Sequence, residues 1–166
     1  MDIFETKTYD SGRDLMDNLS KEAFLLSENP SEDNEFVKEK NSLIEVGFSY
    51  FDIGLKPQIK MFSETKTVFF GINQKLECIS YQNRNKLFSN SLSFPLYEIL
   101  ADSCSEFVVC ICELEILVYK KSGIFLWKMG FGDIVDDYSL SDEKTIIVKT
   151  ADGNITEFYL SSGKVK

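Results

Sequence analysis

Two sets of side chains in this 166-residue sequence have types and spacing suited to chemistry, and the first is a group of carboxylates. Asp133, Asp136 and Asp137 lie within GFGDIVDDYSLSD, where closely spaced acids could act as a general acid and base. Histidine is absent, which removes Ser-His-Asp and Cys-His systems and imidazole metal ligands. No nucleophile or base with a supporting motif accompanies the acids. We therefore predict that the protein is not an enzyme, with an unrecognised carboxylate site as an alternative.

The second set consists of four cysteines: Cys78, Cys104, Cys110 and Cys112. Cys110 and Cys112 are two residues apart in FVVCICELEILVY, a pattern typical of a strand, so both side chains should point to one face and Ile111 to the other. A four-thiolate zinc site needs two close pairs, and Cys78 and Cys104 do not form one. We expect buried, reduced thiols, with no bound metal and no cofactor.

The net charge of −9 is concentrated at the two ends of the chain. The balance is −7 over residues 1–45, +1 over 46–130 and −3 over 131–166. Such a chain repels phosphate, so we expect no direct contact with nucleic acid or membrane, whereas a basic protein would be attracted. Two acidic loops are the predicted partner-binding sites: Glu28, Glu32, Asp33 and Glu35 in the first, and Asp133, Asp136 and Asp137 in the second.

The first residues and the hydropathy pattern bear on location. The start, MDIFETK, lacks the basic and then apolar blocks of a signal peptide. No run of 18 apolar residues could form a spanning helix. These features predict a cytoplasmic protein.

Residues 1–41 differ from the rest and are predicted to be a helical and acidic-loop segment. A helix is expected over residues 12–26, capped by Ser11 and ended before Pro30. Its apolar stripe has steps of four, four and three residues: Leu15, Leu19, Ala23 and Leu26.

Residues 42–166 are predicted to form a β domain. Short runs rich in β-branched and aromatic residues alternate with turn residues, and Asp152-Gly153 between KTIIVKTA and NITEFYL is a strong hairpin signal. The runs repeat, which predicts three similar units near residues 57–95, 96–132 and 133–166. Two sets of equivalent positions define the repeat: Val68, Val108 and Ile146 at the first strand, and Tyr81, Tyr119 and Tyr159 at the close of the second.

The last unit, IVDDYSLSDEKTIIVKTADGNITEFYLSSGKV, resembles a β-propeller blade of the WD-repeat or quinoprotein type. The likeness rests on the order of turn, strand, Asp-Gly hairpin, aromatic strand and Ser-Gly-Lys turn, and it extends over residues 57–166. The Trp-Asp and Gly-His pairs of a true WD repeat are absent. Three units are fewer than the roughly four to eight blades of a closed propeller. The resemblance therefore implies a mainly β fold of repeated antiparallel hairpins, open or partly closed, with one N-terminal helix over an exposed sheet face or edge.

A small, acidic chain without signal peptide or catalytic motif also resembles, in general character only, the bacterial toxin-immunity proteins. That likeness implies stoichiometric binding of a basic partner, such as a nuclease toxin, through the acidic loops. The alternative is a propeller-like scaffold or accessory module that binds other proteins.

Overall fold

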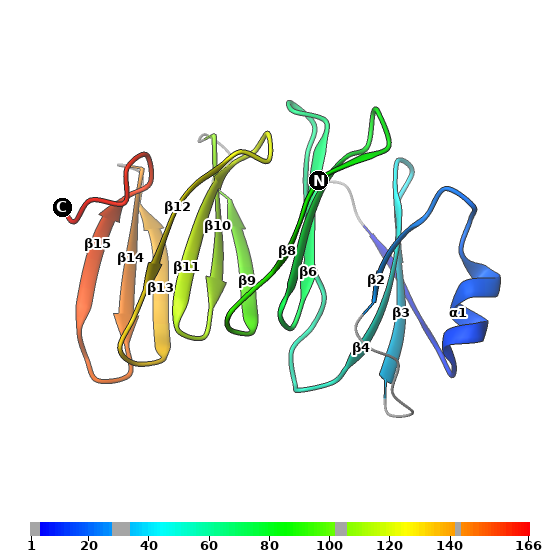
Figure 1. Cartoon of the computed structure of the whole chain (residues 1–166), viewed down its shortest axis with the longest axis horizontal. Coiled ribbons are helices and arrows are strands. Elements are labelled where there is room, and N and C mark those ends of the chain that lie inside the picture. Colours follow the sequence, from blue (N-terminus) through cyan, green and yellow to red (C-terminus); the bar gives the residue numbers. More distant parts are fainter. Residues whose placement is uncertain (1–3, 28–33, 102–105, 142–143) are drawn as a thin grey trace.

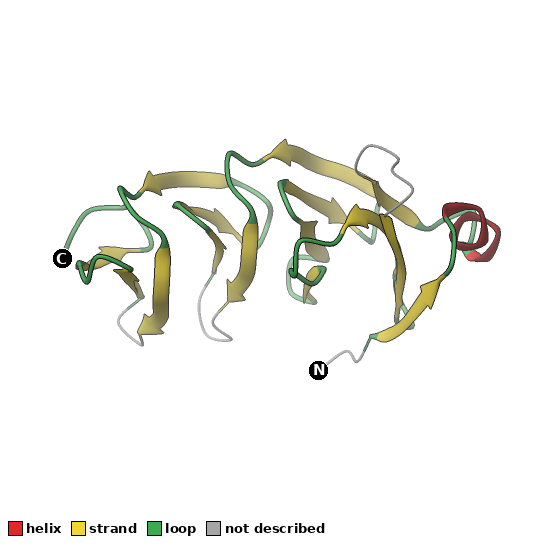
Figure 2. Cartoon of the chain, turned by 90° about the horizontal axis from the view of Figure 1, so that it is seen from below, coloured by secondary structure: helices red, strands yellow, loops and turns green. Residues whose placement is uncertain are grey.

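The computed structural model of the chain describes residues 4–27, 34–101, 106–141 and 144–166. Within them the fold is mainly β, as predicted, with one short helix. Four small sheets, which we name A to D in chain order, stand side by side in an open row (Figure 1). Figure 2 shows the same row from below, with sheet A and sheet D at opposite ends.

Sheet A has the strand order β1-β3-β4-β2 and carries the helix α1. Its strands pair antiparallel except for β2, which runs parallel to β4. The bounds are β1 Glu5–Tyr9, α1 Gly12–Asn18, β2 Phe24–Ser27, β3 Asn34–Lys40 and β4 Glu45–Phe51.

Sheets B, C and D are antiparallel meanders, in which each strand pairs with its neighbour in the chain. Sheet B contains β5 Gln58–Phe62, β6 Thr67–Ile72, β7 Lys75–Ser80 and β8 Asn85–Ser91. Sheet C contains β9 Leu96–Ala101, β10 Phe107–Cys112, β11 Glu115–Lys120 and β12 Phe125–Gly130. Sheet D has three strands, β13 Val135–Ser141, β14 Thr145–Thr150 and β15 Ile155–Tyr159.

Three hydrophobic cores fill the spaces between successive sheets. Because side chains alternate along a strand, a strand in the middle of the row contributes to two cores at once. Val108 and Cys110 on β10 face sheet B, whereas Val109 and Ile111 on the same strand face sheet D. All six residues of β10, and likewise of β6, are buried. Short, continuous apolar runs in the sequence therefore mark strands that are covered on both faces.

The two ends of the row are covered in different ways. The helix α1 packs on the outer face of sheet A with Leu15 buried (Figure 1). Gly47 on β4 permits this approach, because a Cβ there would lie 2.7 Å from a methyl carbon of Leu19. On β14 the outward positions hold the partly exposed Ile147 and Lys149. A capped face at one end and a partly polar face at the other suit the terminal units of an open repeat array.

The predicted helix over residues 12–26 is wrong in its second half. The helix ends at Asn18, because Leu19 is extended (φ −83°, ψ 141°). Leu26 is buried as predicted, but on β2, where it packs in the core between sheets A and B. The proposed boundary between residues 41 and 42 falls in the turn that joins β3 to β4, and the division of the chain at that point stays a prediction.

One of the two sets of repeat positions is equivalent in space. Val68, Val108 and Ile146 each lie second in a central strand, at the start of the strand as predicted, and each faces the preceding sheet. The tyrosines are not equivalent, and that part of the alignment is wrong. Tyr119 is fully buried opposite Val108, whereas the residue opposite Ile146 is Phe158 and Tyr159 is 40% exposed.

Candidate functional site

Among the described residues, the members of the two predicted acidic loops lie apart. Glu35 is exposed on β3 of sheet A, at one end of the row. The second set lies at the other end, with Asp133 between β12 and β13 and with Asp136 and Asp137 exposed on β13. Sheets B and C stand between them (Figure 1). The remaining members of the first loop, Glu28, Glu32 and Asp33, lie outside the described residues.

A β-bulge places the aspartate pair on sheet D. The register with β14 shifts between Val135 and Asp137, so Asp136 is the extra residue of the bulge. Its carboxylate lies 3.2 Å from the ammonium group of Lys149, and both side chains are about half exposed. Exposed pairs of this kind contribute little to stability. The pair is therefore part of a solvated surface.

Asp133, by contrast, lines a groove between sheets C and D, which we call the C–D groove. Its volume is about 470 Å³. Apolar side chains from β12, from the link to β13, from β15 and from the C-terminal residues line it: Met129, Phe131, Ile155, Phe158 and Val165. Asp133 and Asp152 add carboxylates. The groove lies beside β15, the last strand of sheet D. Sheet D has three strands, whereas sheet C has four.

The two groove carboxylates differ in how they are held. Thr150 donates its hydroxyl to Asp152 at 2.6 Å, and the Asn154 backbone N–H donates to the same oxygen at 3.2 Å. These hydrogen bonds, that from Thr150 first, hold the pKa of Asp152 below its ordinary value. The Asp152 carboxylate therefore stabilises the β14–β15 turn. Asp133 accepts from the adjacent Ile134 N–H at 2.8 Å and is partly exposed at the groove.

A second, smaller hollow lies between sheets B and C, and we call it the B–C pocket. Its volume is about 240 Å³, and its lining includes Glu115, Tyr119, Phe125 and Lys128. Glu115 is only 4% exposed. Its Oε1 accepts from the Ser93 N–H at 3.3 Å, and its Oε2 lies 3.6 Å from the Lys128 ammonium nitrogen. A buried carboxylate thus faces an open pocket with only long contacts to its partners.

The two hollows occupy equivalent places in the repeat. The N–H of Leu96, the first residue of β9 in sheet C, donates at 2.7 Å to the carbonyl oxygen of Asn73, which lies in the β6–β7 turn of sheet B. In the same way, the N–H of Val135, the first residue of β13 in sheet D, donates at 2.8 Å to the carbonyl oxygen of Glu113, which lies in the β10–β11 turn of sheet C. Each bond ties a hairpin turn to the link that leads to the next sheet. Both links lie along the lower edge of the row in Figure 1.

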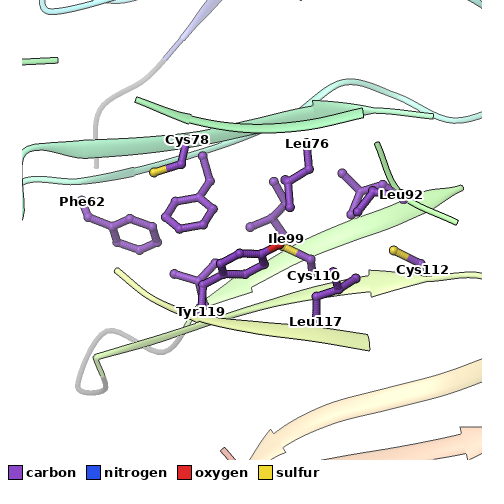
Figure 3. Close-up of a cluster of buried hydrophobic side chains, with 12 residues drawn as sticks. Phe62, Leu76, Cys78, Leu92, Ile99, Cys110, Cys112, Leu117 and Tyr119 are labelled. Atoms are coloured by element: carbon purple, nitrogen blue, oxygen red, sulfur yellow. The ribbon is translucent and has the colours of Figure 1, made fainter. Parts of the chain in front are cut away.

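The described cysteines lie in the core and line neither hollow. Cys78, Cys110 and Cys112 are buried between sheets B and C, with Tyr119 and Leu76 among their neighbours (Figure 3). Cys110 and Cys112 share one face and Ile111 the other, as predicted. Burial raises the pKa of Cys78 and of Cys112 to about 12, so these thiols are neutral and unreactive. Cys104 lies outside the described residues.

Within the described ranges, no group of three or more acids and cysteines is arranged to hold a metal ion. No helix of that part of the chain is long and apolar enough to cross a membrane. The arrangement as described offers recognition surfaces, with apolar walls and a few placed carboxylates.

Sequence reasoning missed Glu115. The signal was present, because a glutamate inside the apolar run CICELEILVY is unusual for a strand covered on both faces. Its spacing from the buried Leu117 and Tyr119 places all three side chains on the sheet B side. The alternation pattern therefore indicates a buried acid at position 115. The pocket itself cannot be read from this pattern, because sheet B supplies its opposite wall.

No protein-family model matches the sequence, and no curated protein matches it. Solved structures do match. The computationally designed Ika8 protein has a TM-score of 0.54 at 12% identity, over 82% of this chain and 46% of that chain. The designed Ika4 protein has a TM-score of 0.52 at 14% identity, over 69% and 72%. Sqt1 of Saccharomyces cerevisiae has a TM-score of 0.51 at 17% identity, over 82% and 45%.

These likenesses concern the fold, which is all-β, built of repeats and propeller-like. The chain spans less than half the length of Ika8 and of Sqt1. The resemblance to propeller blades that the sequence suggested is therefore present in three dimensions, as an open row of sheets without closure.

Proposed function

We propose that the protein is a non-catalytic protein-interaction module whose partner-binding surface is the C–D groove. The observation that carries the proposal is the composition of that groove. Apolar side chains from two sheets form its lining, and the partly exposed carboxylate of Asp133 belongs to it. Apolar surface at the centre with polar groups around it is the usual anatomy of a protein interface.

The setting of the groove supports a macromolecular ligand. Ile155 is 67% exposed and Val165 is 64% exposed, so two apolar side chains that line the groove are accessible to a partner. Single exposed apolar residues are ordinary, but a contiguous group at the border of a groove is typical of an interaction site. The walls belong to hydrogen-bonded strands, so a partner would meet a largely preformed surface.

The charge of the chain supports a basic partner. The net charge is −9, and Asp133, Asp136 and Asp137 all lie at the sheet D end of the row. A basic partner would be steered toward this end, and Asp136 and Asp137 would act mainly on the association rate. Glu35, on sheet A, would contact the same partner only if that partner spanned the row. The proposed contact residues at the groove are therefore Asp133, with Asp136 and Asp137 beside it.

The narrower hypothesis, that the partner is a nuclease toxin and the protein its immunity factor, is a special case of this proposal. It rests on the acidic charge and the absence of catalytic motifs in the sequence. None of the similar structures named above is described as an immunity protein. The more general interaction module is therefore the function that we propose.

The test compares partner capture by matched variants. The groove variant is Ile155→Arg and the control is Ile124→Arg, which changes the net charge equally; Ile124 is 58% exposed and does not line the C–D groove. Tagged wild-type and variant proteins would be incubated with isotope-labelled extract of the native host and the captured proteins quantified by mass spectrometry. We expect a basic protein that the wild type and the control retain and the groove variant loses.

Equal recovery of every captured protein by the groove variant would remove the C–D groove from the proposal. Circular dichroism and an unfolding curve of each variant would show that any loss of capture is not a loss of folding. A retained partner that cleaves nucleic acid, and is inhibited by the wild-type chain, would favour the immunity hypothesis.

A further inference from the structure

We propose that the B–C pocket binds the guanidinium group of an arginine side chain of the partner protein, with Glu115 as its counter-ion. The inference rests on the proposed protein-interaction function, which it deepens by naming the chemistry of one anchor residue. It depends on a different hollow from the C–D groove and on different side chains.

The first step concerns the unusual state of Glu115. The described residues contain three buried carboxylates, at Glu45, Glu77 and Glu115. Glu77 accepts from Lys86 at 2.6 Å and from Ser89 at 2.7 Å. Glu45 accepts from the Ser20 N–H at 2.8 Å and lies 3.3 Å from the Lys40 ammonium nitrogen. The contacts of Glu115, at 3.3 and 3.6 Å, are the longest of the three sets.

A buried carboxylate is costly unless good hydrogen bonds replace its hydration. The 3.6 Å separation from the Lys128 nitrogen exceeds the usual 2.7–3.2 Å of an N–H···O bond. The Lys128 side chain is 58% exposed, so it can move away at little cost. Glu115 therefore retains acceptor capacity that a better-placed cation could use.

The walls of the pocket favour guanidinium over ammonium. The rings of Tyr119 and Phe125 meet edge to face, with centroids 5.4 Å apart and planes at 67°. Phe125 is 50% exposed and lines the pocket. A guanidinium group is planar, stacks on aromatic faces and donates two parallel hydrogen bonds to a carboxylate. A lysine ammonium group offers neither the stacking nor the paired hydrogen bonds.

The rim of the pocket is polar and set by fixed contacts. The Asn90 side-chain amide donates to the Tyr119 hydroxyl at 3.1 Å, which holds that phenol at the edge of the hollow. Burial raises the pKa of Tyr119 well above its ordinary value, so the phenol stays neutral and does not compete for the cation. The single negative charge that lines the pocket is then that of Glu115.

The experiment is a titration of isotope-labelled protein with N-acetyl-arginine amide, followed by NMR. Two matched probes are N-acetyl-citrulline amide, which keeps the shape without the charge, and N-acetyl-lysine amide. We expect saturable shift changes at Glu115, Leu117 and Phe125 with the arginine probe, weaker binding of the lysine probe and none with citrulline. Glu115→Gln should weaken arginine binding about tenfold, because a charge-assisted hydrogen-bond pair is lost.

A variant that is expected to bind arginine more tightly keeps the test independent of folding, because a loss of folding would weaken binding. Lys128→Met removes the resident cation and should strengthen arginine binding severalfold. Its matched control is Lys149→Met, which changes the net charge equally but removes a lysine paired with exposed Asp136, outside the pocket. The control should bind arginine as the wild type does.

Equal binding of the citrulline and arginine probes, or arginine shifts that survive Glu115→Gln unchanged, would overturn the proposal. Equal affinity for lysine and arginine would overturn its guanidinium part. The outcome of the arginine titration is separable from the outcome of the partner-capture test of the C–D groove. Failure of the arginine probe with partner capture intact removes only this pocket, whereas the reverse outcome removes only the role of the C–D groove.

Discussion

The indole nitrogen of Trp127 donates a hydrogen bond to the carbonyl oxygen of Leu160 at 2.7 Å. Trp127 lies on β12, the outer strand of sheet C, and Leu160 directly follows β15 of sheet D. The same indole packs against the ring of Phe158, with centroids 6.1 Å apart. This side chain thus joins sheet C to sheet D and packs against Phe158, which lines the C–D groove.

The turn after β15 provides the first prediction. Gly163 has φ 69°, and a Cβ there would lie 2.8 Å from Cδ2 of Trp127. Gly153 has φ 87°, but a Cβ there would meet nothing within 4 Å. Gly153→Ala should lower the free energy of unfolding by about 1 kcal/mol through backbone strain alone. Gly163→Ala should lower it by about 3 kcal/mol, because overpacking against the indole is added.

Urea unfolding followed by the fluorescence of Trp127, the sole tryptophan, would measure both values. Equal losses for the two variants would show that the indole does not seat on the Gly163 turn.

The second prediction concerns thiol reactivity. Burial raises the pKa of Cys78 and of Cys112 to about 12, and that of Cys110 well above its ordinary value. In a Cys104→Ser background, these three thiols should react with a disulfide reagent at pH 8 only as fast as the core between sheets B and C opens. Reaction should become complete in 6 M urea. Rapid modification of any of the three in native buffer would contradict their placement.

The third prediction is a fall in stability at alkaline pH. A free cysteine loses its proton near pH 8.5, whereas the buried Cys112 has a pKa raised to about 12. Between these values the unfolded chain binds fewer protons than the folded chain, so the free energy of unfolding falls as pH rises. Burial also raises the pKa of Tyr138 to about 12, so this phenol lowers the free energy of unfolding in the same way as pH rises above 10.

Cys112→Ala tests the assignment. It should lower the free energy of unfolding at pH 7 by about 1 kcal/mol through lost packing. It should also flatten the decline between pH 8.5 and 10.5, because one titrating group is gone. An unchanged slope would mean that Cys112 is not a source of the pH dependence.

The fourth prediction concerns the cap of α1. The Ser11 hydroxyl oxygen accepts from the Asp14 N–H at 3.1 Å. Ser11→Ala should weaken α1 by about 1 kcal/mol, seen as faster amide hydrogen exchange over residues 14–18 with sheets C and D unaffected. Ser20→Ala is the control, because Ser20 contributes its backbone N–H and not its hydroxyl to Glu45. A global loss of protection in Ser11→Ala would show that the helix is needed by the whole row.

The sequence alone determined the β class, the hairpins and the burial of the central strands. These features follow from local chemistry. The repeated spacing places Val68, Val108 and Ile146 at the same position of successive central strands, and the Asp152-Gly153 pair forms a turn because Gly153 adopts φ 87°. The same alternation put Cys110 and Cys112 on one face. The tyrosine alignment failed because spacing along the chain does not fix the register of a hairpin: Tyr119 lies opposite Val108, but the residue opposite Val68 is Ile79 and the residue opposite Ile146 is Phe158.

Tertiary structure alone decided the N-terminal sheet and the binding surfaces. β1 is mostly exposed and polar, and β2 joins β4 in a parallel pair across about twenty intervening residues, so neither strand has a local signal. The spacing of Leu15, Leu19 and Leu26 satisfies a helix, and only the pairing of β2 with β4 gives Leu26 a core. Likewise, Asp133 and Glu115 line hollows because neighbouring sheets supply the opposite walls. A hollow between sheets is a property of their packing, and no single stretch of sequence contains it.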